Sequence, residues 1–169
     1  MKIDNASKAR LAKAYAFAHW SKAGSSAVLH AAVLLTAPVS GYVPQSSHRH
    51  LTDDSTVLLH ILWAANGGVQ PVISTQVFEA KTASKAADLL LYLLGQFEGP
   101  PLKRARAGIG DVAFATSGHR LVVFQRQNLA IVASNIQEKP ADLSGFAASL
   151  SAALGPMESS KPAPSRKKK

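Results

Sequence analysis

The sequence contains no cysteine, which excludes disulfide bonds, thiolate nucleophiles and cysteine-ligated metal sites. It also has few aromatic residues, 7% of the total, and charged residues make up only 17%. The longest apolar run, residues 27–37, is interrupted by His30 and ends at Pro38. It is shorter than the about 20 residues that a membrane-spanning helix needs. A chain of 169 residues without these features suits one domain with a hydrophobic core.

The net charge of +9 is concentrated at the two ends of the chain. Residues 1–22 and residues 155–169 carry +4 each, so the middle of the chain has a net charge of only +1. A nucleic-acid-binding fold normally gathers its cations on one folded face, and this distribution does not favour one. We expect residues 157–169 to be a disordered basic tail that either solubilises the protein or attracts the phosphates of RNA, DNA or anionic lipid.

Residues 1–41 form a separate part of the sequence, a basic amphipathic helix followed by the apolar run. Asn5 is a suitable N-cap for a helix that extends to about Lys22 and ends at Gly24. The apolar positions of one face are Leu11, Ala14, Tyr15 and Ala18. A basic leader before an apolar run resembles an export signal, although no Ala-x-Ala site follows. Residues 1–41 are therefore either a signal or an accessory element whose apolar run is an ordinary buried helix or strand.

Residues 42–156 show the pattern of a mixed helix and strand domain. Residues 42–55 are polar and read as a loop. Strands are expected at 56–63, 69–79, 112–116, 119–125 and 129–135, with helices at 82–94 and 141–154. Pro71 should lie at a strand start or edge, and Gly95 should end the first of these helices. Because the connections are short, we predict an α+β fold: an antiparallel sheet of about five strands with two helices packed on one face, plus the N-terminal helix.

The clearest local signal is a hairpin whose turn includes residues 126–128. Alternation places Val122 and Phe124 on one face of the first strand, directed to the core. Leu121 and Val123 are also apolar, so the other face should be covered too, by the first helix or by a second subunit. This interpretation leaves Arg126 in a solvated turn.

Residues 77–154 contain a Gly-x-Gly-Asp-x-Ala-aromatic turn at 108–114 and an Arg-x-Asn-apolar hairpin at 126–129, between two helices. With these motifs the segment resembles a class of poorly characterised domains in bacterial exported and lipid-anchored proteins. Val112 stands where an acidic residue is usual and Gln127 where glycine is usual, and there is no lipid-attachment cysteine. The resemblance implies a non-catalytic domain facing the cell envelope, without naming a ligand.

Three catalytic or metal-binding interpretations have weak support. The Gly108-x-Gly110-x-x-Ala113 pattern matches a dinucleotide motif only superficially, because a strand rather than a helix is expected after it; a turn stabilised by Asp111 is favoured. The loop residues His48, Arg49, His50, Asp53 and Asp54, with His60, have the residue types of a metal site. His60 is expected on a strand face of its own, so a solvated polar loop is favoured. No serine lies in a nucleophile elbow.

Two groups of residues are candidates for binding. Lys103, Arg104, Arg106, Arg120 and Arg126 could form an anion-binding patch, and the alternative is a solvated basic link. Tyr15, Phe17 and Trp20 could form a membrane-interface or partner-binding face, and the alternative is that they cover the sheet of this domain or of a second subunit.

We therefore predict a non-catalytic binding or structural domain of unknown ligand, with no small-molecule cofactor. The expected partner is a protein, with self-association as one form, and anionic polymers or lipids could bind the basic termini. An extracytoplasmic or cell-envelope location is slightly favoured over a cytoplasmic one. The alternatives are a nucleic-acid-associated accessory protein that uses its basic termini, and an undetected hydrolase or metal enzyme.

Overall fold

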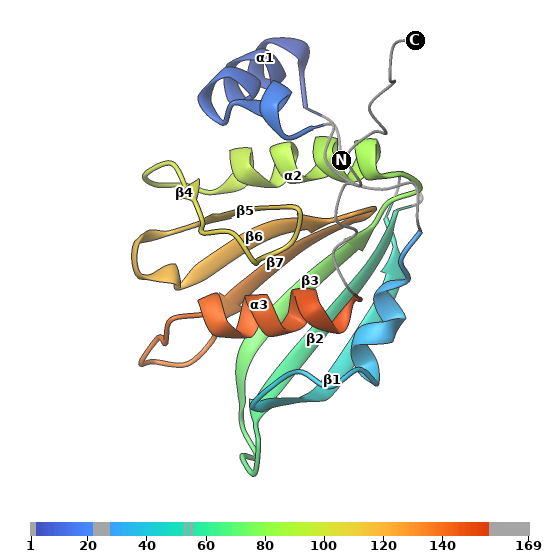
Figure 1. Ribbon diagram of the computed structural model, residues 1–169, viewed down its shortest axis with the longest axis vertical. Coiled ribbons are helices and arrows are strands. Elements are labelled where there is room, and N and C mark those ends of the chain that lie inside the picture. The colour runs from blue at the N-terminus through green and yellow to red at the C-terminus, as the bar shows by residue number, and fades with distance from the viewer. Residues whose placement is uncertain (1–2, 22–27, 53, 55, 156–169) are drawn as a thin grey trace, which may run out of the picture.

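A computed structural model describes residues 3–21, 28–52, 54 and 56–155, which form one antiparallel sheet between layers of helices (Figure 1). The sheet has seven strands in the order β1-β2-β3-β7-β6-β5-β4. The strands are β1 (Tyr42–Leu51), β2 (Val57–Ala65), β3 (Pro71–Glu79), β4 (Lys103–Arg104), β5 (Val112–Ala115), β6 (Leu121–Arg126) and β7 (Leu129–Asn135). The predicted α+β class and antiparallel sheet are confirmed, but the sheet has two more strands than the predicted five.

The two additional strands are the edges of the sheet, β1 and β4. The prediction of a loop at residues 42–55 is wrong, because residues 42–51 pair with β2 along its length, with a register shift between Pro44 and Ser46. Most of β1 is exposed on both faces, so its sequence lacks the apolar alternation by which half-buried strands are identified. Strand β4 is only two residues long and lies in the predicted basic link.

Helices α2 (Ala83–Gln96) and α3 (Ser144–Ala153) lie on opposite faces of the sheet (Figure 1), so the prediction that two helices share one face is wrong. α3 and the 3₁₀-helix η2 (Ala31–Leu35) pack in a core that includes Val122 and Phe124. α2 packs in a second core that includes Val123. Since successive residues of β6 are apolar on both faces, both faces require a cover.

α2 begins as predicted and ends later than predicted. The Thr82 hydroxyl accepts a hydrogen bond from the Lys85 N–H at 3.2 Å and caps the helix. Gly95 does not end the helix, which continues to Gln96. A Cβ atom at Gly95 would lie 2.5 Å from Cδ1 of Leu11, so this glycine allows the close approach of the N-terminal helix.

The N-terminal helix α1 (Asn5–Ala14) packs on the outer side of α2 (Figure 1) and is shorter than predicted. Its cap is Asp4 rather than Asn5, with the Asp4 carboxylate accepting the Ser7 N–H at 2.9 Å. A short 3₁₀-helix, η1 (Phe17–His19), follows it, and the predicted stop at Gly24 lies outside the described residues. No helix in the described part of the chain is long and apolar enough to cross a bilayer.

Aromatic residues after α1 belong to the core. Tyr15 and Trp20 are buried, and their rings lie 5.3 Å and 5.6 Å from that of Phe114 on β5. The Trp20 indole N–H donates to the Tyr15 carbonyl at 2.8 Å. These two rings therefore cover the sheet of this domain. This agrees with the interpretation of the aromatic group as cover of the sheet, and not with that of a membrane-interface or partner-binding face.

The described part of the apolar run is also packed against the sheet. Within η2, Ala31 and Leu34 are buried. The Leu29 N–H donates to the Asn128 side chain at 2.7 Å, and the Ala31 N–H donates to the Glu79 carboxylate at 2.8 Å. The segment is thus an ordinary buried helix in this fold, and the removal of residues 1–41 as a signal stays a prediction. The predicted tail, 157–169, lies outside the described residues.

Candidate functional site

Arg126, one of the predicted anion-binding residues, is buried at the end of β6. It is 1% exposed, and its guanidinium lies 3.1 Å from the Asp111 carboxylate and donates to the Gly155 carbonyl at 2.6 Å. The interpretation of Arg126 as a residue of a solvated turn is therefore wrong. Alternation along β6 continues through Arg126, which points to the same face as Val122 and Phe124.

The other four predicted binding residues are exposed but are spread over several elements. Lys103 and Arg104 are consecutive residues of β4, so their side chains leave opposite faces of the sheet. The Arg104 guanidinium lies 5.6 Å from the centre of the Phe114 ring, within the range of a cation–π interaction. Arg106 follows β4, and Arg120 precedes β6. Their use as an anion-binding patch stays a prediction.

The glycine motif forms a turn, as predicted. The Asp111 carboxylate accepts the backbone N–H of Gln127 at 2.5 Å, and strand β5 follows directly. Gly110 has a φ of +57°, and a Cβ atom there would lie 2.2 Å from the Gln125 carbonyl oxygen. This glycine is required because the turn crosses the backbone of β6 at close range.

The histidines that suggested a metal site lie on strands. His48 and His50 belong to β1, and His48 is directly opposite His60 of β2. The expectation that His60 has a strand face of its own is therefore wrong. The His60 ring nitrogen lies 2.8 Å from the Ser74 hydroxyl of β3. Across residues 3–21, 28–52, 54 and 56–155, no group of three or more ligand side chains could hold a metal ion; Asp53 is outside these ranges.

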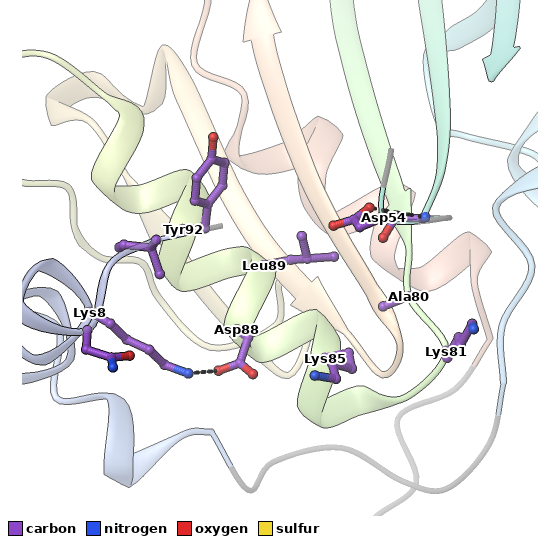
Figure 2. Close-up of a pocket in the computed structure, with 11 residues that line it drawn as sticks. Lys8, Asp54, Ala80, Lys81, Lys85, Asp88, Leu89 and Tyr92 are labelled. Carbon is purple, nitrogen blue, oxygen red and sulfur yellow. Dashed lines mark hydrogen bonds and ion pairs between the residues drawn. The ribbon is translucent and has the colours of Figure 1, made fainter. Parts of the chain in front are cut away.

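A groove of about 530 Å³ lies between α1, α2, the turn after β1 and the end of β3 (Figure 2). Leu89 and Tyr92 of α2 contribute an apolar wall, and its charged residues are Lys8, Asp54, Lys81, Lys85 and Asp88. Lys8 pairs with Asp88 at 2.9 Å, which ties α1 to α2. Lys81 and Lys85 are exposed, and neither ammonium group pairs with a carboxylate in the described part of the chain.

Sequence analysis missed this groove. The only signal was the spacing of Lys85 and Asp88, which places them near each other on one side of α2, with Lys81 just before the helix begins. Asp54, across the groove, accepts hydrogen bonds from the Thr52 hydroxyl and the Thr56 N–H. The bond from Thr52 is the main reason why the pKa of Asp54 lies well below its usual range, so this carboxylate is ionised.

The second open surface is the free edge of β1. Apart from an isolated bridge between Tyr42 and Val39, β1 pairs in the described chain only with β2, and residues 45–51 are all exposed. Their sequence, Gln-Ser-Ser-His-Arg-His-Leu, includes one arginine and two histidines and no carboxylate. Leu51 is 68% exposed at the end of the strand.

No family model matches this chain, and no curated protein or solved structure is similar enough to it to indicate common ancestry. The resemblance to domains of exported and lipid-anchored bacterial proteins therefore stays a prediction.

Proposed function

We propose that this protein is a non-catalytic domain that binds another polypeptide by adding it as an extended strand to the free edge of β1. The observation that carries the proposal is the exposure of seven consecutive residues, 45–51, in a strand already held straight by its pairing with β2. An extended segment added to such an edge gains main-chain hydrogen bonds along its length, which is a recurrent mode of peptide recognition.

The two edges of the sheet differ in a way that supports this role for β1. Strand β4 is only two residues long and follows Pro100 and Pro101, which have no backbone N–H to donate. Short edges with nearby proline are the usual protection against unwanted pairing. Strand β1, in contrast, is ten residues long. Beyond Pro44 and its register shift, it offers a row of backbone donors and acceptors to an incoming chain.

The side chains of β1 favour a different chain over a second copy of this one. Antiparallel pairing of two β1 strands about Arg49 would bring the guanidinium groups of the two copies together, and like charges across a strand pair are destabilising. The protein partner is therefore expected to be a distinct polypeptide.

The partners of the polar side chains around the β6–β7 hairpin favour a structural role for these residues over a catalytic one. Arg126 and Asp111 pair with each other, and Asn128 and Glu79 hold the backbone of residues 29–31. Each of these side chains has a partner within the fold, although Arg126 Nε and the side-chain oxygens of Gln125 and Gln127 have none among the described residues. The polar end of the β6–β7 hairpin thus holds the turn before β5, the end of α3 and the segment before η2 in place.

The test is a selection from a library of random 12-residue peptides on the immobilised full-length protein. Enriched peptides are then measured against wild type, Ser46→Pro and Ser47→Pro. Successive N–H groups of a strand point to opposite edges, so one of the two substitutions removes a donor from the free edge and spares the pairing with β2. The variant that keeps the urea midpoint of the wild type is the informative one.

We expect enriched peptides to bind this variant at least about tenfold more weakly, through the loss of a main-chain hydrogen bond and the steric block by the proline ring. Hydrogen exchange should slow at residues 45–51 in the complex. Equal binding to wild type and variant, protection confined to other elements, or no enrichment would contradict the proposal. A stable dimer that the same variant dissociates would show that the occupant is a second copy.

A further inference from the structure

The groove and the free strand edge meet at the same end of the sheet. The turn that follows Leu51 contributes Asp54 and Thr56 to the wall of the groove, and Ala80 and Lys81 follow directly after β3. Figure 2 shows Asp54 on one side of the groove, with Lys81 and Lys85 near the start of α2. A chain that runs along β1 and continues past Leu51 therefore arrives beside this groove.

The charges of the groove leave two cations available to such a chain. Lys8 is engaged by Asp88, and Asp54 by Thr52 and Thr56. Lys81 and Lys85 are exposed, and in the described residues neither has a carboxylate partner. Leu89 and Tyr92 provide an apolar wall beside them for the methylene groups of a bound side chain.

We infer that the polypeptide bound on β1 is acidic beyond its strand, and that its carboxylates enter the groove and pair with Lys81 and Lys85. This inference rests on the proposed strand addition. The added strand would lie one strand spacing outside β1, and the end of β3 lies two strand spacings inside it. The bound chain would therefore cross three spacings, about 14 Å, to reach the end of β3. An extended chain covers this in about four or five residues.

The peptides enriched in the selection supply the probe. They should carry Asp or Glu about four to six residues beyond the segment that protects residues 45–51. A synthetic copy of the best peptide, with these acids changed to Asn or Gln, should bind wild type about three- to tenfold more weakly at low salt, as expected for two exposed ion pairs. The difference should shrink as the salt concentration rises.

The double variant Lys81→Gln/Lys85→Gln should bind the acidic peptide more weakly by a similar factor and the neutral copy as wild type does. Lys139→Gln, at an exposed lysine in the loop after β7, is the matched control and should change neither. Such a cycle isolates the pairing of acid and lysine from other effects of the substitutions.

The outcomes separate the two proposals. If the proline variant of β1 abolishes binding but the lysine variants bind both peptides like wild type, strand addition stands and the acidic extension is refuted. If the lysine variants weaken the acidic and neutral peptides equally, the lysines do not recognise carboxylates and the inference is again wrong. If no peptide depends on β1, both proposals fall together.

Discussion

The guanidinium of Arg126 and the carboxylate of Asp111 form an ion pair of 3.1 Å inside the protein, with side-chain exposures of 2% and 14%. Asp111 also accepts the Gln127 N–H, and Arg126 also donates to the Gly155 carbonyl. The pair thus joins the turn before β5, the β6–β7 hairpin and the end of α3. Removal of either partner would leave the other charge buried without compensation.

The first prediction is that Arg126→Ala destabilises the protein by about 3 to 5 kcal/mol, because the Asp111 carboxylate then stays buried without its cation. Arg120→Ala is the matched control at an exposed arginine just before β6, and it should change stability by no more than about 0.5 kcal/mol. Urea unfolding followed by circular dichroism measures both. A loss below about 1 kcal/mol for Arg126→Ala would show that the ion pair is not a determinant of stability.

The case of Arg126 shows what the sequence could and could not predict. The alternation of apolar residues in β6 and β7 identified both strands and the buried positions Val122 and Phe124. The same alternation continues to Arg126, but a charged residue at a strand end also looks like part of a solvated turn. Only the three-dimensional approach of Asp111, fifteen residues earlier, makes its burial favourable.

The candidate binding surfaces were hidden from sequence analysis for other reasons. Most of β1 is exposed on both faces, so its sequence lacks apolar alternation and resembles a polar loop. The groove is assembled from α1, α2, the turn after β1 and the end of β3. The proximity of Lys8 to Asp88, eighty residues apart, depends on the packing of α1 on α2.

The second prediction concerns the core strand β6. Val122 is fully buried beneath α3, so Val122→Asp places an unpaired charge in the core and should destabilise the protein by several kcal/mol or prevent folding. Val69→Asp is the control, because Val69 is 80% exposed in the β2–β3 turn and its replacement should cost about 0.5 kcal/mol or less. Urea midpoints compare the two variants, and similar small losses would mean that β6 is not a core strand.

The third prediction is a pH dependence at the start of α3. The Ser144 hydroxyl and N–H groups, with His119 nearby, hold the pKa of Asp142 below its ordinary value of 3.8. A lowered pKa in the folded state means that the ionised carboxylate stabilises the fold above this ordinary value. The stabilisation is then lost as the pH falls through the lower folded pKa.

Asp142→Ala should therefore reduce stability near neutral pH, and its difference from wild type should become smaller below about pH 4. Urea unfolding of both proteins at several pH values between 7 and 3 measures this difference. A difference that is constant over this range would show that ionisation of Asp142 does not contribute to stability. A difference in stability that grows as the pH falls would mean that the protonated form of Asp142, and not the ionised form, stabilises the fold.

The last prediction compares two glycines that have positive φ angles but different surroundings. Gly110 has a φ of +57° and Gly118 a φ of +73°. A Cβ atom at Gly118 would meet no atom within 4 Å, whereas one at Gly110 would lie 2.2 Å from the Gln125 carbonyl oxygen and 2.8 Å from the Phe124 ring. Both alanine variants carry the strain of the left-handed conformation, about 1 to 2 kcal/mol. Only Gly110→Ala adds a clash with the backbone of a central strand.

We therefore expect Gly110→Ala to lower the free energy of unfolding by at least about 2 kcal/mol more than Gly118→Ala does, since the turn must move away from β6. This movement would also lengthen the hydrogen bond from the Asp111 N–H to the Gln125 carbonyl, which is 2.7 Å in the intact turn. Hydrogen exchange at the Asp111 amide should accelerate in Gly110→Ala and stay unchanged in Gly118→Ala. Equal stability losses in the two variants would mean that the turn before β5 can separate from β6 without cost, and that its contact with the strand does not stabilise the fold.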